Sequence, residues 1–164
     1  RSTGTPTVTS MMTDCQVIFD FVRSYMVKKT LTGPLCVMGR SLGSASAIEL
    51  CRTRASEFNC LIIESGFALM APLLKTLGVD VQKIGFNAQK GSENVDKIKT
   101  FSNPLLVIHA QLDHIIPFSE GQALFDACAS TEKTLLEIKG ANHNDIFLRG
   151  MDQYLAHLCA ICLS

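Results

Sequence analysis

Short apolar runs that each precede a helix-like stretch restrict the fold of this sequence more than any other feature. They lie at residues 34–39, 61–63, 105–108 and 134–138, and they do not alternate strictly between apolar and polar positions. Such runs are typical of strands buried on both faces. Strands that alternate with helices along the chain form a parallel sheet with helices on both sides. The sequence therefore predicts an α/β fold, as a single domain over residues 1–164.

Four stretches show the periodicity of amphipathic or buried helices, at residues 10–28, 42–54, 120–128 and 151–162. The segment at about 66–103 departs from this alternation of strand and helix. It contains an apolar helix candidate at 69–77, a stretch with Gly, Asn and Gln, and a short charged helix candidate at 95–99. We interpret the segment as a short cap-like excursion between two strands.

The composition supports one substantial hydrophobic core and argues against a nucleic acid partner. Hydrophobic residues make up 47% of the 164 residues, and 15 basic residues balance 15 acidic ones. No cluster of Lys or Arg is interleaved with aromatic residues, so we expect no nucleic acid binding. The apolar runs are far shorter than the ~20 residues of a membrane-spanning helix. Membrane association and oligomeric state are left open by these features.

The cysteines indicate free thiols. Their number, seven, is odd, and several of them, such as Cys36 and Cys60, lie inside apolar runs. Free cysteines behave as small hydrophobic residues in a reducing compartment, so we expect a cytoplasmic protein. Cys159 and Cys162 form a C-x-x-C pattern in an apolar helical stretch without a second pair, and we interpret them as buried helix residues. No metal site follows.

A G-x-S-x-G motif at residues 39–43 (GRSLG) directly follows an apolar run and directly precedes a helical stretch. This is the position in which a serine occupies a sharp strand-to-helix turn and presents its hydroxyl above a sheet. Ser41 is therefore the candidate nucleophile. The partial positive charge of the helix N-terminus and the Leu42 N–H would face an oxyanion formed beside it.

Two other interpretations of the motif are an ordinary strand-to-helix turn and a phosphate-binding loop. A dinucleotide site requires G-x-G-x-x-G, and a P-loop ends in Gly-Lys-Ser/Thr. The motif has neither pattern. The serine hydrolase interpretation therefore depends on an acid and a histidine further along the chain.

Asp113 and His143 supply that pair, in the order Ser, Asp, His. Each follows a predicted strand, and active sites of open α/β sheets form at the carboxyl ends of the strands. We predict that His143 is the general base and that Asp113 orients it. Glu64 and Asp145 remain rival acids.

The other histidines have simpler interpretations. We expect His109, at the end of a strand, to be structural, His114 to face solvent, and His157 to lie on the terminal helix. Arg40, inside the motif, is interpreted as a surface residue or a residue behind the site rather than as a clamp on substrate.

Three blocks, at 39–50 (GRSLGSASAIEL), 107–117 (VIHAQLDHIIP) and 140–146 (GANHNDI), resemble signature blocks of the α/β-hydrolase superfamily. More narrowly, they are similar to its depalmitoylase-related and prolyl-oligopeptidase-like branch. The resemblance implies a Ser41-Asp113-His143 triad, acyl-enzyme chemistry, and neither a metal nor another cofactor.

The resemblance also implies that strands precede the chain. The family places three or four strands and a helix before the loop that 2–7 (STGTPT) resembles, so we expect the chain to be N-terminally incomplete. One donor to the oxyanion normally comes from that part, and Leu42 supplies the other.

The function expected from these features is hydrolysis of an ester, thioester or lipid acyl bond in a small-molecule or acylated-protein substrate. Phe67, Met70 and Leu74, in the excursion, are the candidates for binding an acyl chain. The alternative is a non-catalytic α/β-hydrolase scaffold that binds a protein or a small molecule. A serine peptidase is a lesser alternative.

Overall fold

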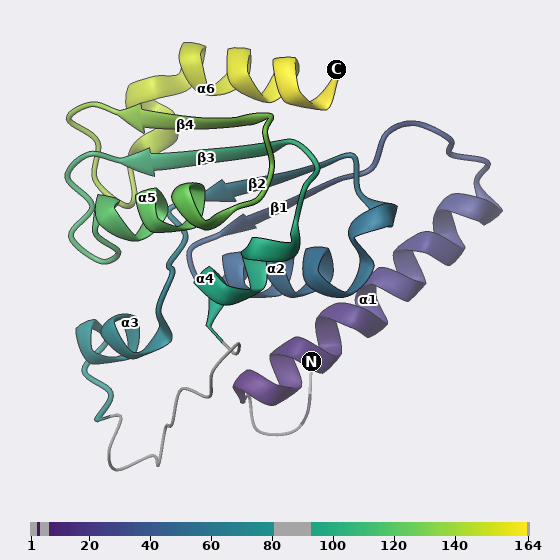
Figure 1. Cartoon of the computed structure of the whole chain (residues 1–164), viewed down its shortest axis with the longest axis horizontal. Helices are drawn as coiled ribbons and strands as arrows, with labels where there is room; N and C mark the ends of the chain where they lie inside the picture. The colour runs from purple at the N-terminus through teal and green to yellow at the C-terminus, as the bar shows by residue number, and fades with distance from the viewer. Residues whose placement is uncertain (1–2, 4–6, 81–92, 164) are drawn as a thin grey trace.

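A computed structural model describes residues 3, 7–80 and 93–163. Its centre is a parallel sheet of four strands in the order β1-β2-β3-β4 (Figure 1). The strands are β1 (Cys36–Arg40), β2 (Cys60–Glu64), β3 (Leu105–Ala110) and β4 (Lys133–Ile138). The α/β fold with a parallel sheet, predicted from the apolar runs, is confirmed.

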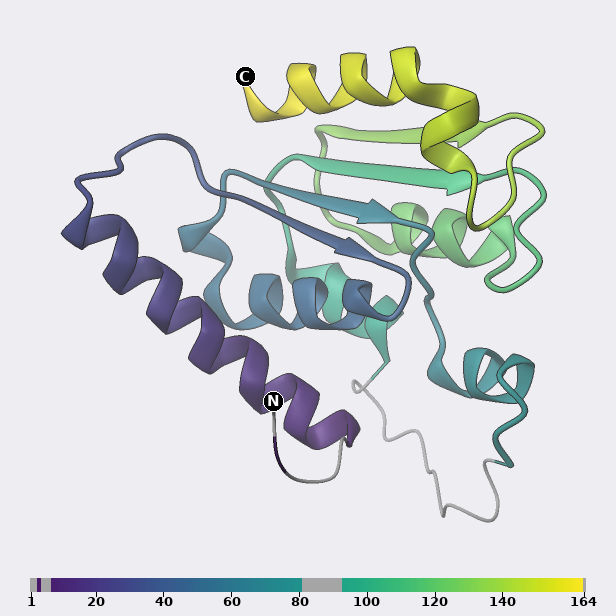
Figure 2. The ribbon, with the colours of Figure 1, turned by 180° about the vertical axis from the view of Figure 1, so that it is seen from behind.

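Helices cover both faces of this sheet, as Figures 1 and 2 show from opposite sides. Helices α2 and α5 lie on one face, and α6 lies on the other. The helices are α1 (Val8–Lys28), α2 (Gly43–Arg54), α3 (Met70–Thr76), α4 (Asn94–Lys97), α5 (Phe118–Ala127) and α6 (Ile146–Cys162), with short 3-10 turns at Ala55–Glu57 and Ile98–Thr100.

Two hydrophobic cores explain why the strands read as continuous apolar runs. On β2, Leu61 and Ile63 belong to the core beneath α2 and α5, whereas Cys60 and Ile62 belong to the core beneath α6. Successive side chains of a strand point to opposite faces, so a strand between two helical layers is apolar along most of its length, and the exception on β2 is Glu64 at its carboxyl end. All five residues of β2 are buried.

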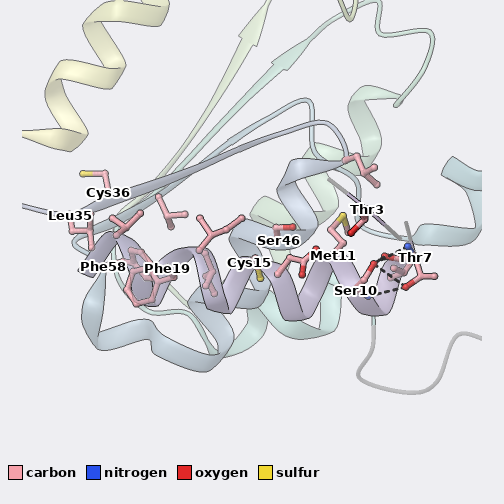
Figure 3. A pocket seen from close by; sticks show the side chains of 17 residues that line it. Thr3, Thr7, Ser10, Met11, Cys15, Phe19, Leu35, Cys36, Ser46 and Phe58 are labelled. Carbon is pink, nitrogen blue, oxygen red and sulfur yellow. Dashed lines mark hydrogen bonds between the residues drawn. The ribbon is translucent and has the colours of Figure 1, made fainter. Parts of the chain in front are cut away.

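Helix α1 lies along α2 and leaves an apolar groove beside strand β1 (Figure 3). Thr7 and Ser10 form a capping box at its N-terminus, and Cys15 and Phe19 are its buried residues. The groove has a volume of about 1140 Å³, and its lining includes Phe19 and Leu35. None of Ser41, Asp113 and His143 lines it.

Strand β1 pairs with β2, and within the described residues no strand pairs with its other edge. A sheet edge of this kind has backbone N–H and C=O groups free for a further strand. The expectation that family-like strands precede the chain stays a prediction, and this edge is where one of them would pair.

The excursion at 66–103 contains helices where the sequence pattern predicted them. Helix α3 lies in its first part, and α4 and a 3-10 turn lie in its last part. Carboxylates hold the start of α3, since Glu120 accepts hydrogen bonds from the N–H groups of Ala68 and Leu69, and Glu93 accepts one from Met70. Residues 81–92, which include the predicted Gly-, Asn- and Gln-containing stretch, lie outside the described residues. Whether the excursion acts as a cap stays a prediction.

All seven cysteines are free. Cys159 and Cys162 lie on α6 as expected, but the prediction that both are buried was wrong, because the face of α6 that carries Cys159 points away from the sheet and this side chain is exposed. The sulfur of Cys162 lies within 4.8 Å of those of Cys36 and Cys60. Burial raises the pKa of the Cys60 and Cys162 thiols, which keeps them protonated at neutral pH. No helix within 7–80 and 93–163 combines the length and the hydropathy needed to cross a membrane.

His109 is fully buried at the end of β3. Its Nε2–H donates a hydrogen bond of 2.9 Å to the carbonyl oxygen of Ile116. Its ring stacks edge-on against Phe118, with 5.8 Å between ring centroids. Burial lowers the pKa of His109, so the ring is neutral at physiological pH. Gly121 of α5 packs directly on this ring, and a Cβ at Gly121 would overlap His109 Nδ1.

We expect Gly121→Ala to lower the free energy of unfolding by about 1–3 kcal/mol, because the added methyl group overpacks a buried ring. Gly33→Ala is the matched control, since a Cβ at Gly33 meets no atom within 4 Å. Urea denaturation of both variants measures the difference. Equal stability of the two variants would contradict the packing of α5 on His109.

Candidate active site

Ser41 occupies the tight turn between β1 and α2. Its backbone is in the left-handed region, with φ 51°, which is rare for a residue other than glycine. The Ser41 N–H donates a hydrogen bond of 2.9 Å to the carbonyl oxygen of Glu64. A Cβ at Gly39 would lie 2.6 Å from the Gly43 carbonyl oxygen and 2.7 Å from Ser44 Cα. The turn therefore requires glycine at position 39, and it places the half-buried Ser41 at the carboxyl end of the sheet.

Asp113 and His143 lie in the loops that follow β3 and β4, at this same end of the sheet. His143 Nδ1 is 2.8 Å from Asp113 Oδ2, and His143 Nε2 is 3.1 Å from Ser41 Oγ. The side chains of the acid and the base are buried. The three residues predicted from the sequence thus meet in the hydrogen-bonded geometry of a nucleophile, a base and an acid.

The surroundings of Asp113 keep its carboxyl group ionised. Burial acts to raise its pKa, but the N–H groups of Ile116 and Ile115 and the His143 ring outweigh burial, and the pKa lies below the ordinary value. Oδ1 accepts both backbone hydrogen bonds, at 2.8 Å from Ile116 and 3.0 Å from Ile115. An ionised carboxylate only accepts, so His143 Nδ1 carries the proton and Nε2 is free to accept one from Ser41.

The rival acids are engaged elsewhere. Glu64 accepts hydrogen bonds from Arg40 Nε, at 2.8 Å, and from the Tyr154 hydroxyl, at 2.6 Å. Asp145 accepts hydrogen bonds from Asn142 and pairs with Arg149 on α6. Asp113 is the carboxylate that bonds to the His143 ring.

The other two histidines lie away from this arrangement. His114 is exposed in the loop after Asp113. On α6, His157 Nδ1 lies 2.7 Å from the carbonyl oxygen of Gln153.

The N-terminus of α2 supplies a hydrogen-bond donor beside Ser41. Within the described part of the chain, no group accepts a hydrogen bond from the Leu42 N–H. Helix α2 begins at Gly43, so its partial positive charge also lies next to the Ser41 hydroxyl. An oxyanion that forms beside Ser41 can therefore accept a hydrogen bond from Leu42.

Two of the three candidates for acyl-chain binding are already packed against the protein. Phe67 and Met70 are buried in a small apolar cluster with Ala45 of α2 and Ile116, and Leu74 is half-buried against it. Ala45 is four residues from Ser41, and Ile116 donates to Asp113. The cluster is therefore adjacent to the catalytic candidates, whereas its role in binding stays a prediction.

Sequence reasoning missed the contacts that support His143 from behind. Arg40 Nη2 donates a hydrogen bond of 2.6 Å to the carbonyl oxygen of His143, across a separation of 103 residues. The only sequence signals are an arginine inside the motif and a glutamate at the end of the next strand. Neither residue reveals its partner without the topology of the sheet.

Acidification should expose the stabilising role of Asp113. A carboxyl group whose pKa is lowered on folding stabilises the folded state above its unfolded pKa, and that stabilisation is lost as the pH falls through the folded pKa. The ordinary pKa of an Asp carboxyl group is 3.8, so we expect the unfolding free energy of the wild type to decline below about pH 4. The decline should be less steep in Asp113→Asn, which lacks this carboxyl group. Asp126→Asn, which removes an exposed carboxylate on α5, is the control. Denaturation curves at a series of pH values measure the slopes, and parallel slopes for wild type and Asp113→Asn would contradict the electrostatic environment described for Asp113.

Comparison with known proteins places the chain in a family. Residues 14–154 match the prolyl oligopeptidase family. Alpha/beta hydrolase domain-containing protein 17C of Mus musculus is 29% identical over 166 aligned residues, which cover 95% of this chain and 47% of that protein. The chain spans about half the length of the curated relatives it matches.

Solved structures share the fold at low sequence identity. A monoacylglycerol lipase from Paleococcus ferrophilus superposes with a TM-score of 0.64 at 16% identity, over 90% of this chain and 75% of that chain. An acylaminoacyl peptidase from Pyrococcus horikoshii gives a TM-score of 0.71 at 15% identity, over 88% of this chain and 26% of that chain. The α/β-hydrolase resemblance of the three sequence blocks is thereby confirmed, and the chain belongs to the prolyl oligopeptidase family within the α/β-hydrolase superfamily.

Proposed function

We propose that the protein is a serine hydrolase that cleaves ester or thioester bonds through an acyl-enzyme. The observation that carries the proposal is the continuous hydrogen-bonded series from Asp113 through His143 to Ser41, with heavy-atom distances of 2.8 and 3.1 Å. These distances lie within the range required of a nucleophile and its base. Membership of the prolyl oligopeptidase family supports hydrolysis as the reaction class.

In the first half of the reaction, Ser41 Oγ attacks the substrate carbonyl carbon while His143 Nε2 accepts the hydroxyl proton. The carbonyl oxygen becomes an oxyanion, to which the Leu42 N–H donates a hydrogen bond. The tetrahedral intermediate then collapses, the bond to the leaving oxygen or sulfur breaks, and His143 returns its proton to the leaving group. Ser41 is left acylated.

In the second half, water replaces the leaving group. His143 takes a proton from water, whose oxygen attacks the acyl carbon, and the second tetrahedral intermediate releases the carboxylic acid. The proton on His143 returns to Ser41 Oγ. Asp113 stays ionised throughout and stabilises the protonated imidazole ring, in keeping with its lowered pKa.

An apolar acyl group is the substrate portion best supported by the surroundings. The side chains of Leu42 and Leu112, which neighbour Ser41 and Asp113 in sequence, are 48% and 62% exposed. The cluster of Phe67 and Met70 also contains Ala45 and Ile116, which lie four and three residues after Ser41 and Asp113 in the sequence. We therefore propose that the acyl chain of a small ester or of an acylated protein binds between these apolar groups, with Leu74 at its border.

Two other functions remain as outcomes of the tests. A serine peptidase would use the same residues, and the acylaminoacyl peptidase from Pyrococcus horikoshii has the same fold. A non-catalytic scaffold would keep the fold without turnover.

We also propose a cytoplasmic location, as expected from the free cysteines.

Ser41→Ala should abolish covalent labelling by a fluorophosphonate probe and reduce ester hydrolysis by a factor on the order of 10³ or more, because both require the activated hydroxyl. Gel fluorescence and hydrolysis of p-nitrophenyl esters measure the two effects. Ser24→Ala, which changes an exposed serine on α1, is the control and should label like the wild type.

Labelling of folded wild-type protein that survives Ser41→Ala would assign the reactive serine elsewhere. A wild type that neither labels nor turns over would favour the scaffold function. A peptide anilide hydrolysed faster than the matching ester or thioester would favour the peptidase.

Leu74→Ser should lower the octanoyl-to-acetyl ratio of kcat/KM by about 10-fold, since apolar contact with a few methylene groups contributes about 1–3 kcal/mol. Leu77→Ser is the control, because Leu77 directly follows α3, is 58% exposed and lies outside the apolar cluster. Steady-state kinetics on the two p-nitrophenyl esters measure the ratio. An unchanged ratio in Leu74→Ser would place the acyl chain elsewhere.

A further inference from the structure

A partly buried cluster of charged and polar side chains lies behind the candidate triad and has no role in the reaction as proposed. It consists of Arg40 on β1, Glu64 on β2 and Tyr154 on α6. Arg40 and Glu64 are paired neighbours at the carboxyl ends of their strands. The side chain of Glu64 is 10% exposed and that of Arg40 is 46% exposed. The buried Glu64 carboxylate is the member that is costly to desolvate, so it requires well-placed hydrogen-bond partners.

Every charged group of the cluster has a partner. Arg40 Nε lies 2.8 Å from Glu64 Oε1, and the Tyr154 hydroxyl donates to Glu64 Oε2 at 2.6 Å. Burial, and then the hydrogen bond to Glu64, raise the pKa of Tyr154, which keeps its hydroxyl protonated as a donor. The guanidinium plane of Arg40 is thus fixed from one side by Glu64, and Glu64 is fixed in turn by α6.

A second nitrogen of Arg40 contacts the loop that carries His143. Arg40 Nη2 donates to the backbone carbonyl oxygen of His143 at 2.6 Å. Glu64 also contacts the nucleophile, since its own carbonyl oxygen accepts the Ser41 N–H at 2.9 Å. One residue therefore holds the backbone of Ser41 directly and the backbone of His143 through Arg40.

We infer that Arg40, held by Glu64 and Tyr154, is a positioning residue that sets the distance between the His143 ring and Ser41 Oγ. The inference rests on the proposed function and extends it to three residues that do not touch the reacting atoms. A misplacement of a catalytic group by 1 Å can cost about 100-fold in rate. Support of this kind therefore affects turnover much more than substrate binding.

The principal test is Arg40→Met, which keeps much of the side-chain length and removes both hydrogen bonds. We expect kcat for a p-nitrophenyl ester to fall by about 10- to 100-fold with KM changed by less than about threefold, because positioning acts on the chemical step. Active sites are counted by fluorophosphonate titration, so that misfolded protein does not enter kcat. Glu64→Gln should lower kcat less than Arg40→Met does, and Tyr154→Phe should lower it least.

Arg52→Met is the matched control. Arg52 pairs with Glu49 on α2 with side-chain exposures of 44% and 12%, close to those of Arg40 and Glu64, and it contacts no residue of the triad. It should lower stability to a similar degree and leave kcat within twofold of the wild type. If kcat of Arg40→Met also stays within twofold of the wild type, the inference is overturned, and the cluster is a purely structural ion pair.

A second measurement does not depend on turnover. The proton between His143 Nδ1 and Asp113 is expected to give a downfield resonance in ¹H NMR, assigned by its loss in His143→Ala. We expect this resonance to persist in Arg52→Met and to broaden or shift in Arg40→Met. If the wild type proves inactive, the proposed function fails, but the spectra still show whether Arg40 positions the base. An unchanged resonance in Arg40→Met would overturn the inference by itself.

Discussion

The close approach of α2 to the end of β1 is the contact on which the site depends. Gly39 permits it, because any side chain there would meet the Gly43 carbonyl oxygen and the Ser44 backbone. The approach forces Ser41 into a left-handed backbone conformation, which costs on the order of 1–3 kcal/mol for a non-glycine residue. The buried core between α2 and the sheet offsets this strain. The turn is too tight for the Ser41 side chain to pack inward, so the half-buried hydroxyl lies at the carboxyl end of the sheet.

The parallel sheet then determines what the hydroxyl meets. The carboxyl ends of β2, β3 and β4 lie on the same side of the sheet as Ser41, because the strands are parallel. The loops after β3 and β4 therefore bring Asp113 and His143 close to Ser41, although they are far along the chain. The helical layers on the two faces keep the strands in register. The distances from Asp113 to His143 and from His143 to Ser41 are therefore consequences of strand pairing, with side-chain rotamers contributing the last adjustment.

This dependence on topology explains how much could be predicted from the sequence. The apolar runs indicated the strands. Ser41 became a candidate through the G-x-S-x-G motif, and Asp113 and His143 became candidates through their side-chain chemistry and their places after two further parallel strands. Contacts made by long side chains were not predictable in the same way. Arg40 was interpreted as a surface residue or one behind the site, because a contact across 103 residues has no local pattern. The exposure of Cys159 was missed for a related reason, since the face of α6 that meets the sheet is determined by the loop before it.

Glu64 shows how one buried carboxylate can serve two purposes in such a fold. Glu64 was a rival to Asp113 because it is a carboxylate at the carboxyl end of a strand. Strand pairing, however, places it beside Arg40. A buried charge is tolerated only when it is paired, and here the pairing partner also reaches the His143 carbonyl oxygen. The backbone of Ser41 is bonded to the same residue. A displacement at the end of β2 would therefore shift Ser41 and His143 together, which preserves the distance between them better than two independent supports would.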